Sequence, residues 1–106
     1  MKRQFHNDLV PAEPTHPGEV LREELAARQM TQTDLAQVTG RPPQTINMII
    51  NGRKGVSAET ALDLEKAFPE IPADFWLQLD MRYRLNVERI RRQVRMTEPG
   101  RQAARA

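Results

Sequence analysis

The sequence predicts an all-α protein made of five helices, of which the last is much longer than the others. Apolar residues recur every three to four positions in successive segments, which is the spacing of one helical face. Prolines, glycines and capping residues separate these segments, and no segment shows the alternation of a strand. The 106 residues suffice for one compact domain. We expect an arm over residues 1–15, the domain over residues 16–96 and a disordered basic tail over residues 97–106.

The composition excludes several classes of protein. The chain has no cysteine, so it forms no disulfide and no thiolate metal site. It has no apolar run near the roughly 18 residues of a membrane span and no signal-peptide core, so we expect a cytoplasmic protein without a membrane partner. The formal charge of +2 is uneven: residues 1–81 hold eight Lys and Arg against twelve Asp and Glu, and residues 82–106 hold eight Arg against two Glu.

The first two helices are predicted from their end signals. His16-Pro17 opens the first helix, because proline suits the first helical position, and the helix is expected to end near Gln29. Thr31 and Asp34 form a capping box at the start of the second helix, with Asp in place of the usual Glu. This short helix ends at Gly40, which supplies the positive φ of a turn.

Pro42-Pro43 opens the third helix, since a residue before proline is held extended, as an N-cap must be. Its apolar face carries Ile46, Ile49 and Ile50, and the helix closes at Asn51-Gly52. Arg53, Lys54 and Gly55 then form a basic turn.

The last two helices are separated by a proline-containing break. Ser57 caps the fourth helix, and Pro69 and Pro72 end it. The fifth helix is expected from about Ala73 to about Met96, with a length of about 35 Å. Its apolar stripe comprises Phe75, Leu79, Tyr83, Val87, Ile90 and Val94. Such a helix is longer than is needed to cover the core of a small helical domain.

Residues 32–51 have the length of two short helices joined by a tight turn, which predicts a helix-turn-helix. Ala36 is small enough for the third helix to cross the second closely, and Leu35, Ile46 and Ile49 can be buried between them. The opposite face of the third helix can then enter a major groove. That face carries Gln44, Thr45, Asn47 and Met48. The alternative interpretation is an αα-hairpin with a merely solvated face.

The chain resembles the Xre-type, lambda-repressor-like helix-turn-helix family and, more narrowly, the HigA-like antitoxins of bacterial toxin–antitoxin operons. The resemblance covers about residues 15–85 and rests on the order and spacing of five short segments. These are His16-Pro17-Gly18-Glu19, Gln44-Thr45-Ile46-Asn47, residues 51–57, Thr60-Ala61 and Phe75-Trp76-Leu77. It implies a five-helix lambda-repressor-like domain with an extended C-terminal helix, a homodimer, repression of its own operon and neutralisation of a ribonuclease toxin.

The predicted DNA contacts divide into base readout and phosphate anchoring. Gln44 suits a bidentate contact to adenine, Thr45 and Met48 suit a thymine methyl, and Asn47 suits a base or a phosphate. Phosphate contacts are expected from Gln32 at the start of the second helix, as the resemblance implies, and from Asn51, Arg53 and Lys54. Arg41 either reaches a phosphate or stays solvated. The backbone N–H groups of Gln44 and Thr45 are expected to be free to hold a phosphate.

Two departures from the family pattern concern the turn. Thr39 stands where an aliphatic residue is usual, so the packing of the second helix is expected to be rotated or weaker. Pro42-Pro43 replaces the usual Ser-Arg, which removes a side-chain cap and a base-contacting arginine.

The partner surfaces are expected away from the third helix. The last helix is the predicted dimer element, through Tyr83, Val87, Ile90 and Val94, because its stripe continues beyond the compact body. The arm and the acidic first helix are the predicted toxin surface, since the toxins of this family are expected to be basic. That surface comprises Phe5, Leu9, Val10, Glu19 and Glu23, with the arginine-rich last helix as the competing surface.

No set of residues supports an enzyme. The only histidines are His6 and His16, and His16 is interpreted as a helix-start residue. No nucleophile set, carboxylate pair or glycine-rich phosphate loop occurs, so we expect no catalytic residue, metal or cofactor. Two alternatives to an antitoxin stay open. One is a stand-alone Xre-type regulator, and the other is an adaptor that lost DNA binding, which the net charge of −4 over residues 1–81 keeps open.

Overall fold

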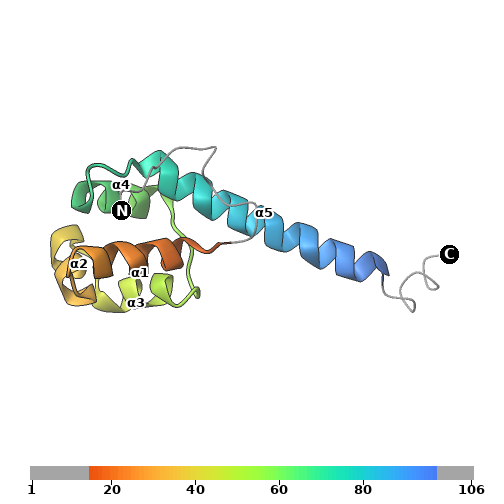
Figure 1. The fold of residues 1–106 in the computed structure, drawn as a ribbon, viewed down its shortest axis with the longest axis horizontal. Helices are drawn as coiled ribbons and strands as arrows, with labels where there is room; N and C mark the ends of the chain where they lie inside the picture. The colour runs from red at the N-terminus through yellow and green to blue at the C-terminus, as the bar shows by residue number, and fades with distance from the viewer. Residues whose placement is uncertain (1–14, 98–106) are drawn as a thin grey trace.

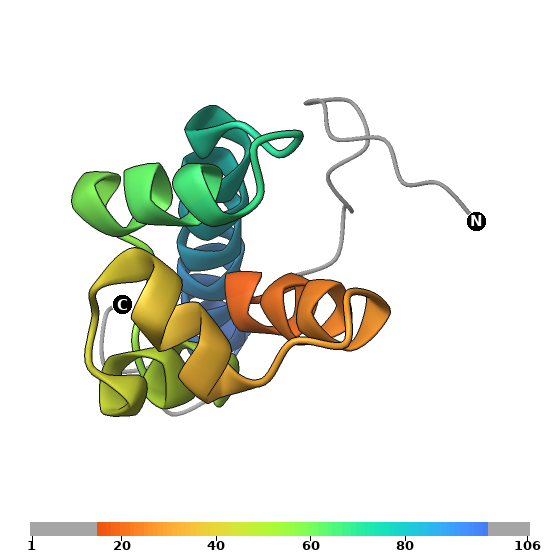
Figure 2. The ribbon, with the colours of Figure 1, turned by 90° about the vertical axis from the view of Figure 1, so that its left-hand side faces the viewer.

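The computed structural model describes residues 15–97, which form five helices and no strand. The helices are α1 (Pro17–Ala27), α2 (Gln32–Thr39), α3 (Pro43–Ile50), α4 (Ala58–Ala67) and α5 (Ala73–Thr97). Helices α1 to α4 gather at one end of α5, whose other end projects beyond them (Figure 1). Figure 2 looks along α5 and shows the four short helices around its near end. The predicted all-α fold of five helices is therefore confirmed.

Helix α1 begins and ends through local contacts of its own flanking residues. The Nδ1 atom of His16 accepts a hydrogen bond from the backbone N–H of Gly18 at 2.9 Å, which confirms His16 as the N-cap. The helix ends two residues before the predicted Gln29, because Gln29 adopts a left-handed conformation with φ of 54°. The N–H of Met30 then donates to the carbonyl of Leu25 at 2.9 Å, which closes the helix end.

The predicted ends of α2, α3 and α4 are confirmed. The Thr31–Asp34 capping box makes both of its reciprocal hydrogen bonds, at 2.9 and 3.0 Å. Gly40 ends α2 with φ of 74°, and Pro42 is the extended N-cap of α3, with φ of −60° and ψ of 142°. The hydroxyl of Ser57 accepts the N–H of Thr60 at 3.2 Å and caps α4.

One apolar core joins all five helices. Leu21 of α1, Leu35 of α2, Ile49 of α3 and Leu64 of α4 are each fully buried. The proximal part of α5 covers them with Phe75, Trp76 and Leu79, so Trp76 is a core residue. Helix α1 packs closely on α3, since a Cβ atom added at Gly18 would lie 2.0 Å from the carbonyl oxygen of Ile49. Only glycine fits at this crossing.

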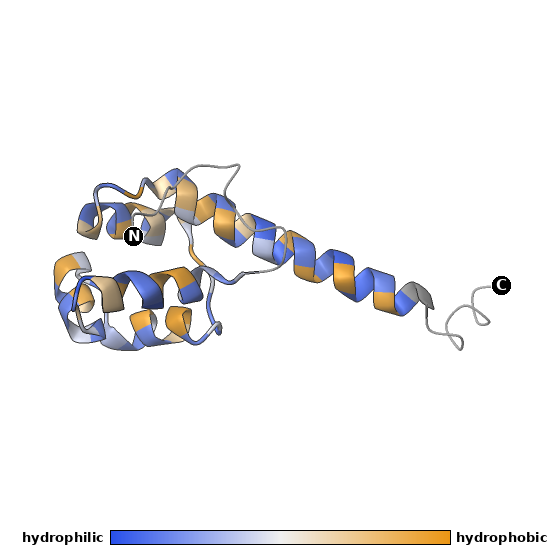
Figure 3. Cartoon of the chain, in the orientation of Figure 1, coloured by the Kyte–Doolittle hydropathy of each residue, from blue (hydrophilic) through white to orange (hydrophobic). Residues whose placement is uncertain are grey.

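The apolar stripe of α5 leaves the core halfway along the helix. Leu79 is buried and Tyr83 is half-buried, whereas Ile90 and Val94 are 47% and 58% exposed. Figure 3 shows hydrophobic positions recurring along the part of α5 that projects beyond the other helices. In the fold of the described residues, the distal end of the stripe at Ile90 and Val94 is therefore exposed.

Two sets of predictions lie outside the described residues. Residues 1–14 and 98–106 include nearly all of the expected arm and tail, together with the predicted toxin contacts Phe5, Leu9 and Val10.

None of the helices between residues 15 and 97 combines the length and hydropathy required to cross a membrane.

Candidate nucleic-acid interface

The helix-turn-helix of α2 and α3 is held together by a small buried cluster. Leu35, Ile46 and Ile49 are completely buried, and Ala36 is 5% exposed where the two helices meet. The side chains predicted to bind DNA lie on the surface around this cluster. Gln44, Asn47, Met48, Asn51, Arg53 and Lys54 are exposed, and Gln32, Arg41 and Thr45 are half-buried.

Three amide side chains form a continuous row across the exposed side of the helix-turn-helix. The Nδ2 group of Asn47 donates to Oε1 of Gln32 at 3.2 Å, which joins α3 to the start of α2. The Nδ2 group of Asn51 donates to Oδ1 of Asn47 at 3.0 Å, one helical turn further along. Each end of the row retains polar groups that can bind outward, because an amide has both donors and acceptors. The row therefore holds Asn47 in a defined orientation beside Gln44 and Met48.

This amide row was not predicted from the sequence. Asn47 and Asn51 are four residues apart on one helix, and this spacing would have indicated their contact. The link from Asn47 to Gln32 joins residues 15 positions apart in different helices, so no local pattern indicates it.

The prediction of two free backbone N–H groups at the start of α3 is wrong for Thr45. Its N–H donates to the carbonyl of Pro42 at 3.0 Å, and the N–H of Ile46 reaches the same oxygen at 3.4 Å. The first turn of α3 is tight enough to use the Thr45 donor internally. The N-cap residue Pro42 makes no side-chain hydrogen bond. This absence was predicted, because a proline side chain has no donor or acceptor group.

A close-packed turn follows α3 and presents the two basic side chains. The N–H of Arg53 donates to the carbonyl of Met48 at 2.8 Å, and Gly52 adopts a φ of 75°. These features form the six-residue closure typical of helix ends with a left-handed glycine. Arg53 and Lys54 are exposed and adjoin the exposed face of α3.

The buried carboxylate of Asp80 anchors the end of this basic turn to α5. Its Oδ1 atom accepts the backbone N–H of Val56 at 3.1 Å, and its Oδ2 atom pairs with Nε of Arg84 at 3.0 Å. A Cβ atom added at Gly55 would lie 2.6 Å from the same Oδ1 atom. No sequence pattern indicated Asp80 as a buried anchor, because its partner Val56 lies 24 positions away.

His16 occupies the junction between α1 and α5. Its ring meets the edge of the Tyr83 ring at 4.8 Å, and the residue is 7% exposed. Burial lowers the pKa of His16, although the negative charges of Asp80 and Glu19 oppose the shift. Its Nδ1 atom accepts the N–H of Gly18 and therefore carries no proton, so the ring is a neutral cap, which confirms its interpretation as a helix-start residue.

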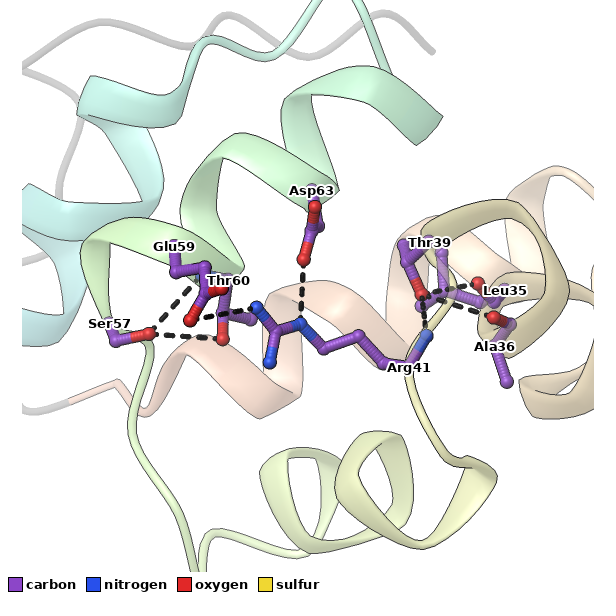
Figure 4. Close-up of polar contacts among 8 residues, drawn as sticks. All are labelled: Leu35, Ala36, Thr39, Arg41, Ser57, Glu59, Thr60 and Asp63. Carbon is purple, nitrogen blue, oxygen red and sulfur yellow. Dashed lines mark hydrogen bonds and ion pairs between the residues drawn. The ribbon is translucent and has the colours of Figure 1, made fainter.

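Arg41 is held by two carboxylates of α4 (Figure 4). Its Nε atom donates to Oδ2 of Asp63 at 2.6 Å, and one of its Nη atoms lies 3.4 Å from Oε1 of Glu59. Of the two alternatives given for Arg41, the solvated side chain is wrong, because the side chain is paired and only 21% exposed. A phosphate contact by Arg41 stays a prediction that requires this pair to open.

Thr39 secures the other side of the turn. Its hydroxyl donates to the carbonyl of Leu35 at 2.8 Å and accepts the backbone N–H of Arg41 at 3.3 Å (Figure 4). The neighbouring Val38 is 42% exposed. Thr39 thus binds the turn through its hydroxyl where the family pattern has an aliphatic side chain.

The partner surfaces predicted from the sequence are partly accessible. Glu19 and Glu23 are exposed on α1. Along α5, Tyr83 packs on His16 and Val87 is half-buried, so the most exposed part of the predicted dimer stripe begins at Ile90. The described residues contain no group of three or more His, Cys, Asp and Glu arranged to hold a metal ion.

The comparisons with known proteins agree with this geometry. The helix-turn-helix family model matches residues 21–76. Virulence-associated protein A of Dichelobacter nodosus is 35% identical over 74 residues, which cover 69% of this chain and 72% of that protein. Its relative, virulence-associated protein A′, is 34% identical over 73 residues, which cover 69% of this chain and 64% of that protein. The match thus spans slightly less than two thirds of the length of protein A′.

Several solved structures share the fold at more than 30% identity. An addiction module antidote protein of the HigA family from Coxiella burnetii has a TM-score of 0.72 and 33% identity, over 79% of this chain and 91% of that one. The Pseudomonas aeruginosa antitoxin HigA, solved with the higBA promoter, has a TM-score of 0.72 and 32% identity, over 82% and 98%. Another Pseudomonas aeruginosa protein, solved in complex with its operator DNA, has a TM-score of 0.73 and 31% identity, over 84% and 99%.

Proposed function

This chain belongs to the HigA-type helix-turn-helix family, and on that premise we propose that it is a DNA-binding antitoxin that represses its own operon and neutralises a cognate toxin. Members of this family are non-enzymatic regulators, so the chain is not an enzyme. The observation that carries the DNA-binding role is the amide-rich exposed face of α3, bordered by the exposed basic turn. The proposal also places the protein in the cytoplasm, together with the DNA of its operon.

Sequence specificity is proposed to come from the first turns of α3. An exposed glutamine such as Gln44 matches the N6 donor and N7 acceptor of adenine in the major groove. Met48 is 37% exposed and offers an apolar surface to a thymine methyl, as does the half-buried Thr45. Asn47 is oriented by the amide row, so little side-chain entropy remains to be lost when it binds.

Affinity is proposed to come mainly from phosphate contacts on both sides of α3. Gln32 lies at the first position of α2, and Asn51, Arg53 and Lys54 lie where α3 ends. Contacts of this kind fix the register of the protein on DNA and carry no base information. The proposal therefore assigns affinity and specificity to different residues, which mutations can separate.

Two copies of the chain are proposed to bind a near-palindromic operator. One recognition helix reads few base pairs, and a two-fold dimer places two such helices about 34–36 Å apart. The exposed distal part of the α5 stripe, with Ile90 and Val94, supports a dimer contact through this helix.

The toxin is proposed to bind away from the α3 face, so that one chain can hold DNA and toxin together. The exposed Glu19 and Glu23 on α1 give this helix an acidic surface that suits a basic ribonuclease. The arm before α1 is proposed to extend this surface through Phe5, Leu9 and Val10, which lie outside the described residues.

Titration of promoter DNA tests the proposed function against its alternatives. Specific binding to the DNA upstream of its own gene, relative to a scrambled duplex, supports a repressor and contradicts an adaptor that lost DNA binding. Co-expression with the neighbouring gene separates an antitoxin from a stand-alone regulator. An antitoxin restores growth and co-purifies with the neighbouring protein, whereas a stand-alone regulator does neither.

A further inference from the structure

The Arg41–Asp63 pair joins the turn of the helix-turn-helix to α4, a helix outside the motif. The Nε–Oδ2 distance is 2.6 Å, and the two side chains are 21% and 28% exposed. The more distant Glu59 is 83% exposed at 3.4 Å, so Asp63 is the principal partner. A charge-assisted hydrogen bond that is partly shielded from water is stronger and less screened by salt than a fully exposed ion pair.

Arg41 directly precedes α3, so the Arg41–Asp63 pair can affect the position of this helix. Arg41 precedes Pro42, the N-cap of α3, and Pro43 occupies the first helical position. Proline fixes φ and also restricts the residue before it, so three consecutive residues have little backbone freedom. A restraint on Arg41 is therefore transmitted to the first turn of α3.

The Arg41–Asp63 pair also compensates for the missing side-chain cap at the start of α3. The N-cap Pro42 makes no side-chain hydrogen bond, whereas α1, α2 and α4 each begin with a side-chain cap. The turn is instead held from outside, by Thr39 on the α2 side and by Asp63 on the α4 side (Figure 4). Helix α4 thus contacts the turn before α3 and is also connected, through the basic turn, to the end of α3.

We propose that Asp63 is a positioning residue for DNA recognition, which acts through Arg41 to set the start of α3 relative to α4. This inference rests on the proposed DNA-binding function and specifies how one part of it is achieved. In this arrangement Arg41 stays paired with α4 when operator DNA is bound and makes no phosphate contact. Asp63 then improves specific binding, although its negative charge by itself disfavours DNA.

The opposed effects of charge and position allow a matched test. Asp63→Ala and Glu59→Ala remove one carboxylate each from the same helix and change the net charge equally. If only charge matters, both variants bind operator and random DNA more tightly. We expect Asp63→Ala to weaken operator binding about threefold to tenfold, a typical coupling within an ion-pair network, whereas Glu59→Ala does not weaken it. Circular dichroism confirms that each variant is folded before titration.

Two further measurements complete the test: the salt dependence of operator affinity, and an exchange of the charges at Arg41 and Asp63. Arg41→Ala should weaken operator binding to a similar extent as Asp63→Ala, with an unchanged slope of log affinity against log salt. The exchange Arg41→Glu with Asp63→Arg should recover most of the operator affinity lost by Arg41→Glu alone, since the pair is restored with its charges reversed.

A slope that falls by about one unit in Arg41→Ala, together with no recovery in the exchange variant, would assign Arg41 to a phosphate and overturn the proposal. Equal tightening by Asp63→Ala and Glu59→Ala would also overturn it. A wild-type protein that does not prefer operator to random DNA contradicts the proposed function itself, and that outcome is visible before any variant is compared.

Discussion

The carboxylate of Asp80 accepts the backbone N–H of Val56 at 3.1 Å and thereby fixes the end of the basic turn to the long helix α5. Asp80 is only 2% exposed, so its replacement by alanine leaves the N–H of Val56 without an acceptor in a buried place. We expect Asp80→Ala to lower the free energy of unfolding by about 1–3 kcal/mol in urea denaturation. Arg84→Ala is the control, because Arg84 is 72% exposed and its loss leaves the hydrogen bond between Asp80 and Val56 in place. Equal losses in the two variants would contradict the role of the buried hydrogen bond.

The crossing of α1 and α3 predicts a strong effect at Gly18. An added Cβ atom would lie 2.0 Å from the carbonyl oxygen of Ile49, and backbone must move to admit it. We expect Gly18→Ala to lower the free energy of unfolding by about 3 kcal/mol or more. Gly40→Ala is the matched control, since Gly40 has open space around it and only its φ of 74° opposes a side chain, at a cost of about 1 kcal/mol. Thermal unfolding that ranks Gly40→Ala as the more damaging change would show that the crossing is less close than described.

The neutral state of His16 predicts that stability depends on pH. Burial lowers the pKa of this side chain in the folded protein, so the unfolded chain binds the proton more tightly. The stabilising contribution is fully present above the ordinary histidine pKa of about 6.5, and it is lost progressively as the pH falls from there through the lowered pKa of the folded protein. We expect His16→Asn, which retains a capping side chain, to flatten this part of the profile in urea titrations between pH 5 and 8. An unchanged profile in the variant would assign the pH dependence to other groups.

The exposed stripe of α5 is the proposed dimer contact, which mutation can test. Replacing both Ile90 and Val94 with glutamine removes its most exposed apolar side chains and should shift the protein towards monomer in sedimentation experiments. Met81 is 52% exposed on the other side of the same helix, and Met81→Gln serves as the control that should stay dimeric. A double variant that stays as dimeric as the wild type would exclude the distal stripe as the main contact.

The helix ends were predictable from the sequence because their causes are local. The Thr31–Asp34 capping box, the left-handed Gly40 and the Pro42 N-cap each depend on residues within four positions of one another. The end of α1 was predicted two residues late, because Gln29 takes a left-handed conformation that is unusual for a side chain other than glycine or asparagine.

The partners of polar side chains were much less predictable. Arg41 finds Asp63 at a separation of 22 positions, and Asp80 finds Val56 at a separation of 24. Such pairs depend on how whole helices pack, and a charge pattern along one helix does not contain that information. The sequence therefore indicated which face of α3 is available to DNA, whereas only the structure identifies the residues that hold α3 in place.

The most direct test of the central claim is a titration of Gln44→Ala and Arg53→Ala against promoter and scrambled DNA at several salt concentrations. We predict that Gln44→Ala loses about 1–3 kcal/mol of binding free energy on the promoter and almost nothing on scrambled DNA. We expect that Arg53→Ala weakens both duplexes similarly and lowers the salt slope by about one unit. Equal weakening of both duplexes by Gln44→Ala would contradict the claim that the exposed face of α3 reads the operator.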